Sequence, residues 1–127
     1  MAGVPSNGFL RLFPLQAVVL YPGMPLPLVV FEPRYLDMVT DARKSHGLIG
    51  MVQPSGQGRD PMTPPIYGVG GVGRIGDYRE TDDGRFLISL AGISRFRIAE
   101  ELAVTTAYRQ VGADWAPFAG DLRPDDG

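Results

Sequence analysis

The sequence of 127 residues contains no cysteine, a single histidine and a single lysine, and its formal net charge is only −2. Without cysteine, disulfides, thiolate catalysis and cysteine-bound zinc are excluded. The lack of basic excess gives no electrostatic reason to bind a phosphate backbone, so nucleic acid is not expected as a partner. No apolar run approaches the ~18 residues of a membrane helix, and the N-terminus lacks signal-peptide features. No membrane association and a cytoplasmic location are therefore expected.

The scarcity of lysine and histidine also limits catalysis. Lys44 follows Arg43 and not a glycine, so it does not complete a phosphate-binding P-loop. Every serine–lysine dyad would need Lys44, at the end of a predicted helix, and every Ser–His–Asp triad would need His46. We expect His46 to cap the helix end or to face solvent. One histidine with scattered carboxylates is poor material for a metal site. We predict no catalytic residue, no metal site and no cofactor.

Glycine and proline, in contrast, are abundant, with 17 and 12 residues. Without a short repeat, this composition favours a turn-rich β protein over a helical one. The hydrophobic share of 44% is ordinary for a globular protein. A chain of this length fits one domain, which buries roughly two thirds of the surface of its unfolded chain.

The stretch from Phe13 to Gly47 is the most apolar part of the chain, and we expect the fold to be organised around it. It predicts a strand through the apolar residues 18–20, a turn at Pro22–Gly23 and a second strand at residues 26–30. Two prolines at the start of this second strand cannot donate ladder hydrogen bonds, so the strand is expected to begin at a sheet edge or corner.

A helix is predicted from Pro33 to Lys44, because proline fits the first helical turn. Basic residues in the last turn offset the helix dipole, and Gly47 is expected to provide a left-handed cap. Four apolar side chains recur at the i, i+3, i+4, i+7 spacing of one helical face: Tyr35, Met38, Val39 and Ala42.

The remaining chain predicts a flexible tail at residues 1–8, a β domain at residues 9–111 and an extension rich in proline, aspartate and glycine at residues 112–127. Trp115 and Phe118 are expected to pack this extension against the domain. Further strands are predicted at residues 9–13, 48–52, 66–79, 86–90, 95–98 and 102–111. They are separated by a long loop at residues 53–65, a hairpin turn at residues 81–84 and a turn at residues 91–92. We interpret the long loop as a variable solvent loop, with a functional or mobile loop as the alternative.

Several sequence blocks resemble the N-terminal substrate-binding domain of Lon protease, which also occurs in short stand-alone bacterial proteins. The resemblance begins with FPL, PGM-LPL and FEPRY between Phe13 and Tyr35 and covers roughly residues 9–111. It continues in the blocks Gly47–Gly50, Tyr67–Gly70, Arg74–Ile75, Gly84–Phe86 and Gly92–Ile98. It implies a mainly β fold, a bent sheet or PUA-like pseudo-barrel with one main α-helix. Relatives of this family continue into helices after the β domain. The extension at residues 112–127 is therefore expected to be truncated before a helical region.

Three groups of residues are possible site elements. The segment from Gly71 to Gly76 matches G-x-G-x-x-G, but a strand and a turn follow it where a nucleotide site needs a helix, so we interpret its glycines as bends in a strand. Arg95 and Arg97 share a strand face, which we interpret as solvated, with an acidic partner as the alternative. The apolar turn at Tyr21, Met24 and Pro25 either contacts a peptide or plugs the barrel end.

The resemblance implies a non-catalytic module that recognises unfolded or degron-bearing polypeptides, by apolar grooves and open strand edges. A protease or chaperone and a second copy of the chain are further partners consistent with it. The alternative is a structural module that self-associates or acts as a scaffold without binding peptide. A third class, a peptidase or small-molecule hydrolase, lacks support in the residues.

Overall fold

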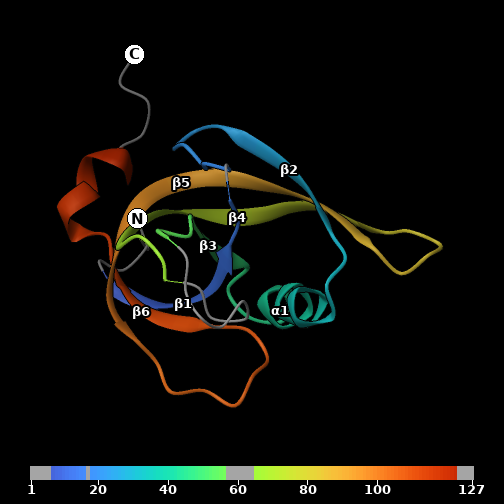
Figure 1. The fold of residues 1–127 in the computed structure, drawn as a ribbon. Coiled ribbons are helices and arrows are strands. Elements are labelled where there is room, and N and C mark those ends of the chain that lie inside the picture. Colours follow the sequence, from blue (N-terminus) through green and yellow to red (C-terminus); the bar gives the residue numbers. More distant parts are fainter. Residues whose placement is uncertain (1–6, 17, 57–64, 123–127) are drawn as a thin grey trace.

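The computed structural model describes residues 7–16, 18–56 and 65–122. Strands dominate this part of the chain, with one α-helix and one 3₁₀-helix (Figure 1). In chain order, the elements are β1 (Asn7–Pro14), β2 (Pro25–Val30), α1 (Pro33–Arg43), β3 (Leu48–Val52), β4 (Val69–Glu80), β5 (Phe86–Glu101), β6 (Gln110–Asp114) and η1 (Ala116–Leu122). The predicted mainly β fold with one main α-helix is confirmed.

The strands form a six-stranded sheet in the order β2-β5-β4-β3-β1-β6, and β6 also pairs with β5. This extra pairing closes β5, β4, β3, β1 and β6 into a barrel and leaves β2 outside it. Among the strands that the structure describes, only β1 and β3 pair in parallel, and the other pairings are antiparallel. Closure leaves β2 as an edge strand, which is consistent with the prolines at its start.

Strand β5 holds the barrel together because it is long enough to serve three neighbours. Residues 86–91 pair with β2, residues 97–101 pair with β6, and β4 follows most of its length. Figure 1 shows β5 curving along the molecule and its hairpin with β4 extending beyond α1. Register shifts at Val72/Gly73, Ile75/Tyr78 and Ile98/Glu100 mark the irregular positions at which such strands bend.

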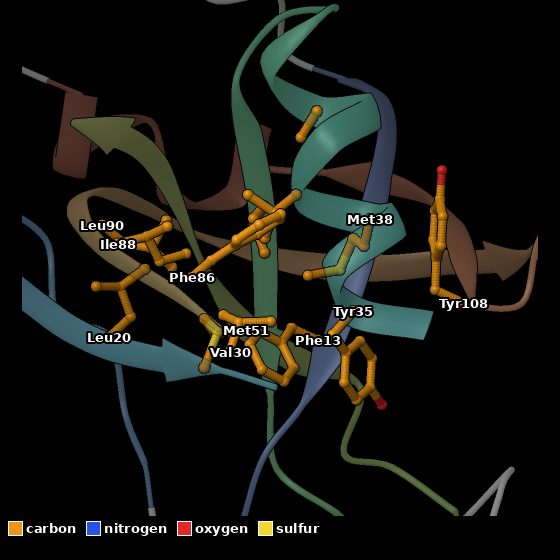
Figure 2. Packing of buried hydrophobic residues seen from close by; sticks show 13 residues of the cluster. Phe13, Leu20, Val30, Tyr35, Met38, Met51, Phe86, Ile88, Leu90 and Tyr108 are labelled. Carbon is orange, nitrogen blue, oxygen red and sulfur yellow. The ribbon is translucent and has the colours of Figure 1, made fainter. Parts of the chain in front are cut away.

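Helix α1 packs on the sheet with the predicted face: Tyr35, Met38, Val39 and Ala42 are buried. Figure 2 shows Tyr35 beside Phe13 of β1, and their ring centroids lie 4.4 Å apart. Gly47 has φ = 75°, and its N–H donates to the Ala42 carbonyl at 2.9 Å, so the predicted left-handed cap is confirmed. The helix ends at Arg43, one residue before the predicted end.

The buried face of α1 belongs to one apolar cluster, together with Phe13. A second apolar cluster includes Leu10, Phe96 and Trp115. Trp115 is buried and Phe118 is half-buried, which confirms that the residues after β6 pack against the domain. The turns at Pro22–Gly23 and before Gly84 are also confirmed, since both glycines have positive φ values of 79° and 81°.

Four of the predicted strands and turns differ from the structure. Residues 91–92 do not turn the chain, because β5 continues through them. Most of the strand predicted at residues 102–111 is a loop, and β6 starts only at Gln110. Residues 18–20 form no strand. In the predicted strand at residues 66–79, Ile66 makes an isolated bridge to Pro54 and the strand starts at Val69.

At the N-terminus, Asn7 and Gly8 belong to β1 and not to a tail, because they pair with Asp114 and Ala113 of β6. The rest of the expected tail, residues 1–6, lies outside the described residues. So does most of the expected loop at residues 53–65, of which residues 57–64 are not described.

Candidate functional site

The described surface contains a cleft of about 670 Å³ near the start of β4. One wall is the segment Val18–Pro22, which connects β1 to β2 in the chain. We call it the crossing segment, because it passes over the sheet. The end of β3 and the start of β4 form the opposite side, and Arg95 of β5 and Asp121 of η1 add polar groups. Segments far apart in the sequence therefore build this hollow together.

The cleft carries apolar side chains that the fold leaves exposed. Val19 is 49% exposed, Tyr21 63%, Tyr67 55% and Val69 48%. All four line the cleft, over buried Leu20, Met51 and Val52. Single exposed apolar residues are common, but a contiguous apolar surface in a concave site is typical of ligand or polypeptide binding.

Glycines determine where the crossing segment lies. A Cβ on Gly71 would overlap the carbonyl oxygen of Leu20, and a Cβ on Gly92 would overlap that of Tyr21. At Gly73, the added carbon would lie 2.6 Å from Cδ2 of Leu20. The missing side chains let the crossing segment approach the sheet closely. This confirms that the G-x-G-x-x-G match belongs to a strand with close backbone approach, without the helix that a nucleotide site requires.

Arg95 and Asp121 form an ion pair at the polar wall. The Nε and Nη2 atoms of Arg95 donate to Oδ2 and Oδ1 of Asp121 at 3.0 and 3.3 Å, and the backbone N–H of Arg95 donates to Oδ2 at 3.1 Å. The hydrogen bond from the Arg95 side chain lowers the pKa of Asp121. The guanidinium also lies 4.6 Å from the ring centroid of Phe118. The face predicted to be solvated is exposed but internally paired.

The predicted site residues separate in the structure. Tyr21 lines the cleft, whereas Met24 and Pro25, both exposed, are not among its lining residues. Sequence reasoning missed Tyr67 and Val69. Their spacing of two in a strand-like stretch was the available signal, since it places both on one face of a strand.

The free edge of β2 offers little backbone for pairing with another chain. Gly92 donates its N–H to the Met24 carbonyl at 2.9 Å. Because backbone groups alternate along an antiparallel ladder, the N–H and C=O groups at residues 25, 27 and 29 then point away from β5, toward the free edge. Two of these are Pro25 and Pro27, which have no N–H. This edge is therefore a poor template for pairing with a further strand.

The residues considered for catalysis have structural contacts. His46 accepts a hydrogen bond at Nδ1 from the backbone N–H of Leu48, at 3.0 Å, and its ring lies 5.0 Å from that of Phe9. Burial, followed by the positive charge of Arg11, lowers the pKa of His46. The histidine is half-buried at the helix end and not fully exposed. Lys44 is the C-terminal cap residue of α1.

Within residues 7–16, 18–56 and 65–122, no three histidine or acidic side chains gather to hold a metal ion. In the same part of the chain, no helix has the length and apolar character that a bilayer crossing would need.

Comparison with known proteins identifies the family. The description "ATP-dependent protease La (LON) substrate-binding domain" matches residues 10–119. This chain belongs to the Lon substrate-binding domain family. The resemblance found in the sequence is thereby confirmed. The match covers the substrate-binding region of Lon and not its ATPase or protease domains.

Relatives and solved structures agree with this assignment. The Lon protease of Dictyoglomus thermophilum is 33% identical over 93 residues, which are 73% of this chain and 12% of that protein. The Lon protease of Flavobacterium johnsoniae is 29% identical over 122 residues, 92% of this chain and 14% of that protein. This chain thus corresponds to a small part of those relatives.

The crystal structure of a Lon N-terminal domain protein from Xanthomonas campestris is similar, with a TM-score of 0.66 and 30% identity, over 85% of this chain and 59% of that chain. The N-terminal domain of Mycobacterium avium complex Lon protease gives a TM-score of 0.64 over 94% of this chain and 59% of that one. At 14% identity, this second likeness supports the fold alone.

Proposed function

We propose that this domain is a non-catalytic module that recognises polypeptide and binds unfolded or degron-bearing proteins in the cleft. The observation that carries the proposal is the exposed apolar lining of the cleft, in a domain of a substrate-binding family. A folded protein buries most of its large apolar side chains, whereas an unfolded segment offers them to such a surface. A cytoplasmic location and delivery of the bound protein to a protease or chaperone belong to the same proposal.

The cleft suits short extended segments with apolar side chains. Val19, Tyr21, Tyr67 and Val69 would contact these side chains without having to leave a folded core. Binding must offset the ordering of a flexible chain, so the affinity of one domain is expected to be roughly micromolar or weaker.

Fluorescence anisotropy tests this function directly. A labelled protein kept permanently unfolded is titrated with the domain, and the same protein in its folded form is titrated in parallel. We expect saturable binding to the unfolded form only. The double variant Tyr67→Ser/Val69→Ser should weaken binding about tenfold or more, because it removes two apolar contacts. Val29→Ser, at a similarly exposed position on β2, is the matched control and should leave binding unchanged. Equal binding to folded and unfolded protein would contradict the proposal.

A second function, self-association or scaffolding, is favoured by the outer surface of β2. Val29 is 51% exposed and Phe31, immediately after the strand, is 62% exposed. Both are candidates for an apolar contact between copies. Sedimentation velocity over a wide concentration range distinguishes this function: Phe31→Ser should abolish a concentration-dependent dimer if this surface forms it. A strict monomer at high concentration would contradict self-association.

A further inference from the structure

The carboxylate of Asp121 is held by a set of donors that all belong to Arg95. The backbone N–H and Nε both donate to Oδ2, and Nη2 donates to Oδ1. Side-on binding by a guanidinium combined with a backbone N–H gives a planar carboxylate good geometry and specificity. Arg95 thus presents a complete binding site for one carboxylate.

This carboxylate site forms part of the wall of the apolar cleft. Arg95 and Asp121 line the cleft together with Tyr21, Val69 and Gly71, and Arg95 pairs directly with Gly71 across the β4–β5 ladder. A second arginine on the same strand face, Arg97, donates from Nη2 to Oδ2 of Asp114 at 3.2 Å but does not line the cleft. Only the first of these two ion pairs lies where a bound polypeptide would meet it.

We propose that Arg95 binds the free C-terminal carboxylate of a polypeptide seated in the cleft, and that Asp121 occupies this position as an internal competitor in the unbound domain. The inference rests on the proposed function and adds a substrate class to it: chains that end in apolar residues. At a chain end, the carboxylate is attached directly to the last residue, so an apolar side chain can enter the cleft while the carboxylate reaches Arg95. Capture of a terminal carboxylate by backbone and cationic donors is an established mode of peptide recognition.

Replacement of Asp121 by a peptide carboxylate is physically reasonable. The Arg95 side chain is 55% exposed and that of Asp121 is 16% exposed, so solvent reaches the pair from the arginine side. Ion pairs within reach of solvent contribute little to stability. Asp121 belongs to the short 3₁₀-helix η1 near the end of the described chain. On release, its carboxylate would be hydrated by solvent while Arg95 keeps an equivalent partner. The exchange therefore leaves no buried charge unpaired.

The test compares two labelled peptides with the same apolar sequence, one ending in a free carboxylate and one in an amide. The free acid should bind about tenfold more tightly, because the amide loses a charge-assisted pair. Asp121→Asn should increase the affinity for the acid and leave that for the amide nearly unchanged. Arg95→Gln should remove the difference between the peptides, whereas Arg97→Gln, the matched control, should keep it. Circular dichroism verifies that each variant is folded.

The outcomes separate this inference from the proposed function. If both peptides bind equally to the wild type and to Asp121→Asn, the carboxylate site is refuted while recognition in the cleft stands. If neither peptide binds to any variant, both proposals are refuted. A third peptide, amidated and carrying an internal aspartate, tests the terminal position. Binding as tight as that of the free acid would refute the choice of a terminal carboxylate.

Discussion

The hydroxyl of Tyr108 donates a 2.6 Å hydrogen bond to Oδ2 of Asp41 and thereby joins the loop before β6 to helix α1. The same hydroxyl accepts a hydrogen bond from Nε of Arg11 in β1, at 3.2 Å. Figure 2 shows Tyr108 beside the helix, at the edge of the apolar cluster. Burial, with the hydrogen bond to Asp41 as the next cause, raises the pKa of Tyr108. One side chain thus links the helix, the first strand and a loop that lacks secondary structure.

Replacing Tyr108 by phenylalanine should therefore destabilise the domain. The variant keeps the buried ring but leaves Asp41 and Arg11 without their shared hydroxyl, which should lower the free energy of unfolding by about 1–3 kcal/mol. Urea denaturation measures this change. Tyr67→Phe, at an exposed position, is the control and should change stability by less than about 0.5 kcal/mol. Equal stability of the Tyr108→Phe variant and the wild type would show that the bond contributes nothing.

The environment of His46 predicts a loss of stability in mild acid. Burial, followed by the charge of Arg11, lowers the pKa of this histidine, and Arg74 adds to the effect. In the unfolded chain, its pKa returns to about 6.5. Near and below that pH, the unfolded state binds a proton at His46 more readily than the folded state does, so the free energy of unfolding falls as the pH decreases. Above it, the neutral ring is present in both states and the contribution is complete.

His46→Asn isolates this effect, because the Asn side-chain oxygen can still accept the Leu48 N–H that now donates to Nδ1. When the pH is lowered from 7 to 5.5, the urea midpoint of the wild type should decrease, and that of the variant should decrease less. If both proteins show the same dependence over this range, groups other than His46 are responsible.

Gly92 and Gly76 should respond differently to alanine although both lie in paired strands. A Cβ at Gly92 would overlap the Tyr21 carbonyl, so Gly92→Ala must displace the crossing segment and should cost at least about 2 kcal/mol. At Gly76 the nearest atom would be the Ser89 oxygen, at 3.6 Å, which is an ordinary contact. Gly76→Ala should be neutral or slightly stabilising, because alanine loses less entropy on folding. Thermal or urea denaturation of the pair measures the difference, and equal effects would contradict the role assigned to Gly92.

The predictions that the structure confirms rest on local sequence patterns. The buried face of α1 follows from a spacing that repeats within a few residues, and the turns at Gly23 and Gly84 follow from backbone preferences of glycine itself. Gly92 was misread because a glycine in a strand has the same local signature whether it turns the chain or admits another segment. Here it admits Tyr21, which is distant in sequence.

For the same reason, sequence reasoning selected only one of the exposed apolar residues that line the cleft. Tyr21 could be selected as an apolar residue beside a turn, but its neighbours Tyr67 and Val69 join it only through the β3–β4 pairing and the path of the crossing segment. The pair of Arg95 and Asp121 depends on the path of η1 after β6. Contacts of this kind leave no periodicity in the sequence.

Tyr21 and Met24 provide the sharpest test of which apolar residues bind polypeptide. Both are exposed beside the same turn, at 63% and 56%, but only Tyr21 lines the cleft. Tyr21→Ser should weaken binding of unfolded protein by about tenfold, because it removes an aromatic contact of the size that dominates binding surfaces. Met24→Ser should leave the affinity within about twofold. Both variants should unfold at nearly the wild-type urea concentration, because neither residue belongs to the buried core. Anisotropy titrations of the two variants decide the matter: a larger loss in Met24→Ser would move the binding surface from the cleft toward β2, where Met24 adjoins Pro25.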